Sequence, residues 1–176
     1  MALVDQLNPL REGMGRERLS EHYSYLCAYA VNAIFGYEIR GGYYVINKGM
    51  VMKGLSALFG VPRFHKIVHF WNRTQTGIIV DISLPQVDNV NVMTLNAKSG
   101  LARRFERDES IEANHKAKDI MANRALINAL KYLRTRYQSL FNALLNSKTF
   151  KSFSSRNRGV RIEVLPLVNL KKMATR

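Results

Sequence analysis

Residues 108–147 form the longest segment with helical periodicity in this chain, and its length restricts how the chain can fold. Its apolar positions recur three and four residues apart and predict one buried stripe, formed by Leu126, Leu130, Leu133, Tyr137, Leu140, Phe141 and Leu144. Asp108 is a suitable N-cap, with acidic residues in the first turn after it. An unbroken helix of this length would span about 60 Å, which is too long for a compact domain. We therefore expect a break near residues 114–118 or near Asn123.

Two short segments have the composition of β-strands with an unpaired edge. Residues 37–47 read YEIRGGYYVIN, and the Gly41-Gly42 pair predicts a two-residue turn between the strands of a hairpin. The sequences GGYYVI and PLVNL are read as apolar edge strands, whose unpaired backbone groups favour self-association.

The other β-prone segments predict one antiparallel sheet. Residues 64–72, 78–84 and 90–96 are rich in β-branched and aromatic side chains. The run 78–84 is too apolar for a solvated strand, so a central strand covered on both faces is expected. The segment 159–170 is interrupted by Pro166, which favours an edge strand.

The order of these elements predicts an α+β fold. Residues 1–16 are expected to form an irregular N-terminal arm, because Pro9 and Gly13 interrupt it. The apolar spacing after residue 17 predicts a helix capped by Gly36. Residues 17–176 are then a single domain with a basic C-terminal third. It would contain an antiparallel sheet of about four to six strands, packed against a long C-terminal amphipathic helix and an N-terminal helix.

Net charge is the strongest global property of the sequence. The chain carries 27 basic and 13 acidic residues, which gives a formal charge of +14 and a pI near 10.2. From residue 120 onward there are 12 basic residues and one acid, Glu163. A positive field of this kind attracts phosphate polymers or an anionic membrane surface. The sequence therefore predicts a polyanionic partner for the last third of the chain.

The stretch KTFKSFSSRNRGVR, residues 148–161, concentrates this charge. As a predicted loop it offers cations, hydroxyls and backbone amides, the groups that contact phosphates. The predicted nucleic-acid-binding residues are Lys131, Arg134, Lys148, Lys151, Arg156, Arg158 and Arg161. Phe150 and Phe153 are candidates for stacking on unpaired bases, and the alternative is that the two rings anchor the loop to the core. Because no helix presents side chains suited to reading base edges, binding is expected to be largely independent of sequence.

Candidate catalytic or metal-binding residues are few. His65 and His69 have the spacing of a two-ligand helical zinc site, but their surroundings favour a strand. Asp81 and Asp88, with Lys98 downstream, match the pattern of two acids and a lysine found in metal-dependent nucleases. The glycines fit neither a phosphate-binding loop nor a dinucleotide fingerprint. We therefore predict no catalytic residue, no metal site and no cofactor.

Cys27 is the single cysteine, so an intrachain disulfide and a cysteine-based zinc site are excluded. It lies in the apolar run YLCAYAVNAIF and is expected to be a buried, unreactive thiol. Cysteine usage favours a reducing compartment, the cytoplasm or the nucleus, or a virion. No signal peptide and no membrane-spanning segment is expected.

The leading functional prediction is a non-enzymatic, structural or assembly protein that binds nucleic acid, such as a coat, matrix or nucleoprotein subunit, and forms a homo-oligomer. The first alternative is a metal-dependent nuclease or a related nucleic-acid enzyme. The second alternative is a peripheral protein that binds anionic membranes through the same basic surface. The sequence does not distinguish RNA from DNA or single strands from duplexes.

Overall fold

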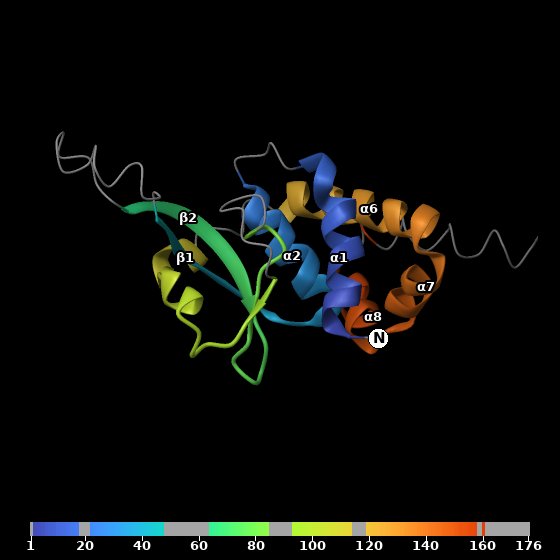
Figure 1. Ribbon diagram of the computed structural model, residues 1–176. Coiled ribbons are helices and arrows are strands. Elements are labelled where there is room, and N and C mark those ends of the chain that lie inside the picture. The colour runs from blue at the N-terminus through green and yellow to red at the C-terminus, as the bar shows by residue number, and fades with distance from the viewer. Residues whose placement is uncertain are drawn as a thin grey trace, which may run out of the picture.

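The computed structural model describes residues 2–17, 22–47, 64–84, 93–113, 119–157 and 160. Its strands are β1 (Glu38–Asn47), β2 (Phe64–Arg73), β3 (Ile79–Val80), β4 (Thr94–Leu95) and β5 (Phe105–Arg107). Its α-helices are α1 (Leu3–Gly13), α2 (Tyr23–Phe35), α5 (Glu109–Ala113), α6 (Asp119–Arg136), α7 (Gln138–Asn146) and α8 (Lys148–Arg156), and two 3-10 helices are η1 (Met14–Glu17) and η2 (Leu101–Arg104). Figure 1 shows the sheet on one side of the molecule, with α1, α2, α6, α7 and α8 gathered on the other. This arrangement confirms the α+β class.

The sheet has five strands in the order β4-β3-β2-β1-β5, and every neighbouring pair is antiparallel. The long pair β1–β2 runs in register from Glu38 opposite Arg73 to Asn47 opposite Phe64. The predicted pairing of the runs 64–72, 78–84 and 90–96 is confirmed, with β3 in a central position between β4 and β2. The predicted edge strand at 159–170 lies outside the described residues, apart from Val160.

The hairpin predicted at Gly41-Gly42 is wrong, because β1 continues straight through both glycines. Neither has the positive φ that a two-residue turn would need. The glycines instead permit close contact between neighbouring parts of the same chain. A Cβ atom on Gly42 would lie 2.0 Å from the carbonyl oxygen of Glu106, and one on Gly41 would lie 2.9 Å from the ring of Phe70. The GGYYVI segment is therefore an inner strand, paired with β2 on one side and with β5 on the other, and not an edge strand.

Gly42→Ala is accordingly expected to destabilise the protein by about 3 kcal/mol, at the upper end of the usual cost of overpacking. The added methyl group would meet backbone atoms of β5, which cannot move aside as a flexible side chain can. Urea denaturation measures the loss. Gly100→Ala is the matched control, because Gly100 has helical φ and ψ and a Cβ there would meet nothing within 4 Å. Equal midpoints for the two variants would contradict the close approach of β1 and β5.

Helix α2 joins the sheet to the other helices. It packs on β2 and also on α6 and α8. The Tyr25 and Phe70 rings meet edge to face with centroids 5.2 Å apart, and the Asn72 side-chain amide donates to the Ala28 carbonyl at 3.0 Å. Gly36 ends the helix in the left-handed conformation, with φ of 75°, as predicted. Cys27 is buried on this helix, also as predicted.

The leucine stripe of α6 and α7 is buried, as the periodicity predicted, except for Tyr137, which is half-buried. Its main neighbours are helices, since α6 packs on α1 and α2, and α2 is the element that lies against β2. Asp108 fulfils its predicted role, because its carboxylate accepts from the Ser110 amide at 2.9 Å at the start of α5. Among the described residues of 108–147 there are three helices, and the break expected at 114–118 lies outside the described residues. The break expected near Asn123 is wrong, because α6 runs through that residue. α5 ends at Ala113, α6 begins at Asp119, and the non-helical Tyr137 separates α6 from α7.

The irregular N-terminal arm predicted for residues 1–16 is wrong, since most of it is helix α1. Leu7, Leu10 and Met14 recur at helical spacing and are fully buried. A Cβ on Gly13 would lie 3.1 Å from the Ala129 backbone, so α1 crosses α6 at close range. Burial of the apolar face against α6 outweighs the cost of Pro9 inside the helix.

A second, smaller core lies on the opposite face of the sheet from α2. Its buried members are Tyr44, Trp71, Ile79, Leu84, Leu95 and Ala102. Phe105 of β5 closes it, with its ring edge to face against Tyr44 at 5.0 Å and against Trp71 at 5.2 Å. This core surrounds His69, whose ring centroid lies 5.5 Å from that of Tyr44.

Candidate functional site

The basic stretch that begins at Lys148 is a helix over residues 148–156, and the loop predicted there is wrong. Ser147 caps it, since its hydroxyl accepts from the Phe150 amide at 3.1 Å. The cap and the three-residue spacing of the two phenylalanines are sequence signals that could have predicted α8. The high charge density of the stretch favoured the prediction of a loop instead.

Phe150 and Phe153 anchor α8 to the core. Their exposed fractions are 2% and 8%, and the Phe153 ring meets Tyr29 of α2 edge to face at 5.6 Å. Rings buried against α2 are not available to a base, so the stacking assigned to them is a wrong prediction and the anchoring alternative describes them. The physical reason is that the helix turns both rings toward the same side, which is the apolar side.

The exposed side of α8 carries its cations. Lys148, Lys151 and Arg156 are all exposed, together with Ser152 and Ser155. We call these five residues the α8 cationic face. Within the described part of the chain, no ion pair joins its three cations to an acid. The Arg156 Nε donates to the Ser152 carbonyl at 3.2 Å, which holds the guanidinium along the helix.

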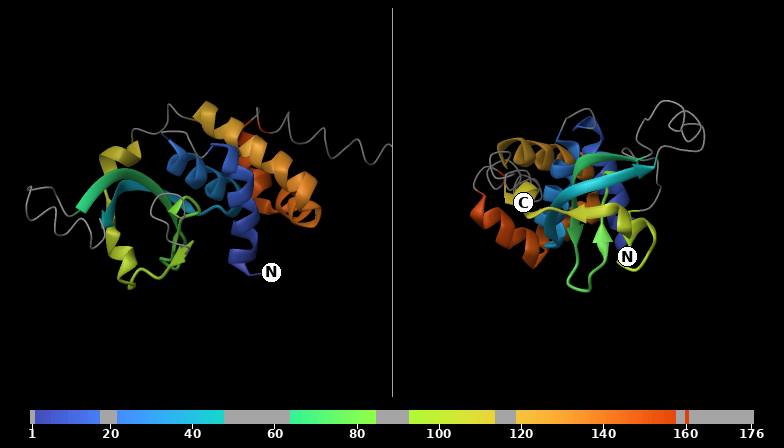
Figure 2. Two further views of the ribbon diagram at one scale, coloured as in Figure 1. Left: turned by 45° about the horizontal axis from the view of Figure 1, so that its top comes forward. Right: turned by 90° about the vertical axis from the view of Figure 1, so that its left-hand side faces the viewer.

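Lys131 and Arg134 lie on a different helix. Lys131 is exposed on α6 and Arg134 is half-buried. Figure 2 (right) shows α6 in gold and α8 in red as separate helices along the same side of the molecule. Both helices pack on α2, so they share a support, but the cations form two groups and not one cluster. Arg158 and Arg161 lie outside the described residues.

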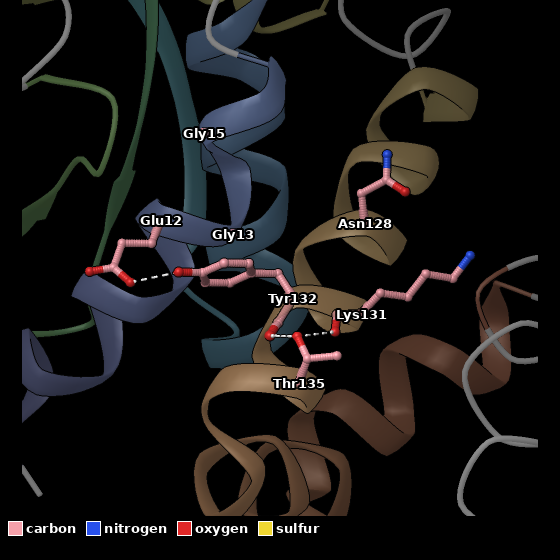
Figure 3. Close-up of a pocket in the computed structure, with 7 residues that line it drawn as sticks. All are labelled: Glu12, Gly13, Gly15, Asn128, Lys131, Tyr132 and Thr135. Atoms are coloured by element: carbon pink, nitrogen blue, oxygen red, sulfur yellow. Dashed lines mark hydrogen bonds between the residues drawn. The ribbon is translucent and has the colours of Figure 1, made fainter.

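The surroundings of Lys131 include an acid. Lys131 lines a cavity of about 510 Å³ with Glu12 and Tyr132, and in Figure 3 its side chain extends away from Glu12. The hydroxyls of Tyr137 and Tyr132 donate to the Glu12 carboxylate at 2.7 and 3.0 Å. The hydrogen bond from Tyr137 is the main cause that holds the pKa of Glu12 below its usual value. A carboxylate that stays ionised in this cavity makes it a weaker anion site than the α8 cationic face.

Acids and bases are distributed unequally over the fold. Near the sheet, several basic residues are paired with acids. Arg107 donates twice to Glu112, at 2.8 and 3.0 Å, and this hydrogen bonding is the main cause that lowers the pKa of Glu112, while Lys66 contacts Glu106 at 2.5 Å. By contrast, residues 120–157 contain seven basic residues and no acid. The positive field therefore arises on the helical side, where the sequence predicted it.

His69 and Asp81, which the sequence places in two separate metal hypotheses, form a buried pair. The His69 Nε2 lies 2.5 Å from Asp81 Oδ2, and both side chains are nearly inaccessible to solvent. Asp81 Oδ1 accepts from the Ser83 amide, the Ser83 hydroxyl and the Leu84 amide at 2.9, 2.6 and 3.1 Å. This network is the reason for an acid in an apolar strand. The Nδ1 of His69 is buried and has no hydrogen-bond partner among the described residues.

The main residue of each metal hypothesis is engaged in this network. His69 is engaged with Asp81 and both oxygens of Asp81 accept hydrogen bonds, while Lys98 is exposed on a turn and Asp88 lies outside the described residues. Of His65 the structure describes only the backbone, opposite Ile46. In the described part of the chain, no three His, Cys, Asp or Glu side chains are grouped so that they could hold a metal ion.

Comparison with known families, with curated proteins and with solved structures gave no match, so the site is interpreted from its own geometry. Of the helices that the structure describes, none is long and apolar enough to cross a bilayer.

Proposed function

We propose that this protein binds nucleic acid through the phosphate backbone and serves as a structural or assembly subunit without an enzymatic step. The observation that carries the proposal is the α8 cationic face, where Lys148, Lys151 and Arg156 are exposed together and no ion pair within the described residues neutralises them. Ser152 lies between Lys151 and Arg156 and adds a hydroxyl donor, whereas the Ser155 hydroxyl donates to the Ser152 carbonyl at 2.8 Å. Lysine, arginine and serine are the side chains that contact phosphate oxygens.

The surrounding charge supports the same proposal. Asp119 at the start of α6 is the one acid in α6, α7 and α8, so little within these helices offsets the attraction of a phosphate polymer. The rigid attachment of α8 through Phe150 and Phe153 fixes the spacing of the cations, which reduces the entropy lost on binding. Backbone contacts of this type do not read sequence, so binding would be similar for different base sequences.

The test is a titration of labelled DNA and RNA over a range of salt concentrations. If Lys131, Arg134, Lys148, Lys151 and Arg156 each neutralise one phosphate, log affinity for duplex DNA should fall against log salt with a slope of about −4.5. No binding at low salt, or a slope near zero, would end the proposal. Sedimentation with vesicles of anionic lipid, run beside the titration, separates nucleic acid from a membrane surface as the polyanion.

Self-association is part of the proposed assembly role. The edge strand first expected at GGYYVI does not support it, because β1 is an inner strand. The described apolar surface that favours contact between copies is at the start of α6, where Ile120 is 85% exposed and Met121 is 50% exposed. Light scattering on the purified protein gives the mass in solution and decides between a monomer and an oligomer.

A second candidate function is a nucleic-acid enzyme, and the observation that favours it is the His69–Asp81 pair. A carboxylate that orients an imidazole is the arrangement used in general acid–base catalysis, and the free Nδ1 of His69 would be the reacting nitrogen. Since His69 is only 1% exposed, a substrate would reach it only after the second core opens. Cleavage of labelled RNA or DNA that is lost in a folded His69→Gln variant would support this candidate. Intact nucleic acid after prolonged incubation, with and without a divalent cation, would exclude it.

A further inference from the structure

A cavity of about 650 Å³ opens where the C-terminal end of α2, the start of α1 and the turn between β2 and β3 meet. In Figure 1 this is the end of the molecule where the N-terminus of α1 and the β2–β3 turn both lie. The volume is in the range of cavities that hold small ligands or single residues of a polymer. None of the residues predicted from the sequence to bind nucleic acid lines it.

One wall of this cavity is an aromatic pair. Phe35 and Tyr37 stack with ring centroids 5.7 Å apart and ring planes 17° from parallel. Both rings are half-buried and pack against the main core on their inner side, so each also keeps an accessible part. An accessible, rigidly supported aromatic surface is what single-stranded nucleic acid uses for stacking, because every base has a π-face. Phe150 and Phe153 lack this property, since they are buried.

The lining of the cavity also includes a cation. Arg73 is exposed at the end of β2, and its guanidinium lies beside Gly77 of the turn, where a Cβ would be 3.6 Å from Nη2. The turn is ordered by the Thr74 hydroxyl, which accepts from the Ile78 amide at 3.0 Å. The one acid that lines the cavity, Glu38, is bound to Arg40 at 2.6 Å. The cavity thus combines a stacking surface with a guanidinium, and its carboxylate is neutralised.

The cavity adjoins the α8 cationic face. Gly36, one of its lining residues, has φ of 75°, and a Cβ there would lie 3.0 Å from the methyl group of Thr149. Thr149 follows Lys148 in the first turn of α8. The surface that leads out of the cavity past Gly36 therefore reaches the first cation of the α8 cationic face.

We propose that the cavity between Phe35, Tyr37 and Arg73 takes an unpaired base of a single-stranded nucleic acid whose backbone continues onto the α8 cationic face. This inference rests on the proposed function and specifies its substrate as single-stranded. The base stacks on the Phe35–Tyr37 pair and Arg73 contacts the adjacent phosphate. A paired base is held inside its duplex and cannot enter a cavity of this kind, so duplexes bind only through the cationic face.

The test compares Tyr37→Leu with the parent protein on oligo(dT), oligo(U) and a duplex of equal length. Leucine keeps apolar volume and removes the π-face. Single-strand affinity should fall about 5- to 150-fold, the range for one lost base stack, and duplex affinity should change less than about twofold. Tyr43→Leu is the matched control, because Tyr43 is also half-buried but lies on β1 away from the cavity, and it should leave both affinities unchanged.

Arg73→Gln is the second variant, which keeps the test decisive if Tyr37→Leu does not fold. It should reduce the salt slope for single strands by about 0.7 and leave the slope for the duplex unchanged. Parent protein that binds single strands and duplexes equally, with no selective loss in either variant, overturns the cavity assignment and leaves the proposed function standing. Parent protein that binds neither nucleic acid overturns both.

Discussion

Asp81→Ala is expected to lower the free energy of unfolding by about 3–5 kcal/mol, the usual cost of removing one partner from a buried pair. The substitution takes away the acceptor of four hydrogen bonds at once, from His69, from the amides of Ser83 and Leu84 and from the Ser83 hydroxyl. These donors lie in the second core, where water does not replace the lost carboxylate. The loss should appear as a lower midpoint in urea denaturation.

Two further variants separate the buried network from the local turn. Asp81→Asn keeps an oxygen for the amides of Ser83 and Leu84 and should lose clearly less stability than Asp81→Ala. Asp108→Ala removes a local arrangement of the same kind, since Asp108 Oδ1 accepts from the amide and hydroxyl of Ser110 at 2.9 and 2.6 Å. That aspartate lies at the surface and pairs with no histidine among the described residues, so its loss should be much smaller. Equal losses for Asp81→Ala and Asp108→Ala would show that the His69 pair adds nothing to the turn.

The sequence was sufficient to predict those elements whose pattern admits one reading. The α2 helix has apolar spacing, a suitable length and Gly36 at its end, and all three agree. The leucine stripe of α6 and α7 is likewise unambiguous. The Gly41-Gly42 pair is compatible with two structures, because glycine is equally suited to a tight turn and to close contact between neighbouring strands. Only the position of β5, 60 and more residues later in the chain, decides between them.

The candidate site was predicted only in part, because the exposure and pairing of its side chains depend on tertiary contacts that the local sequence does not contain. The charge of residues 148–156 is visible in the sequence, and the exposure of its cations follows from it. Which aromatic rings are accessible is not visible, because Phe150 has polar neighbours in the sequence and is buried, whereas Phe35 has apolar neighbours and is only half-buried. The His69–Asp81 pair also depends on the register of β2 with β3, which brings residues 12 apart within hydrogen-bond distance.

Replacement of the three cations of the α8 cationic face, Lys148→Gln, Lys151→Gln and Arg156→Gln together, is expected to abolish most of the nucleic-acid affinity. Each phosphate contact on duplex DNA contributes about 0.9 to the salt slope, so three lost contacts should flatten it by about 2.7. If affinity at 1 M salt is unchanged, this corresponds to a loss of about 500-fold at about 0.1 M salt. The fold should remain intact, because all three side chains are exposed and the anchoring rings are untouched.

The control for this experiment is a second triple variant with the same change in net charge. Lys66→Gln, Lys98→Gln and Arg103→Gln remove three exposed cations from the sheet side, where Lys66 already pairs with Glu106. A long-range field depends on total charge. If binding came from this field alone, affinity would fall equally in both variants, and the fall would be larger at low salt. Direct phosphate contact at α8 requires instead that the α8 variant loses both affinity and salt slope while the sheet variant keeps most of each. Equal losses would assign the binding to net charge alone, and an α8 variant that binds as the parent does would place the contact on another face of the protein.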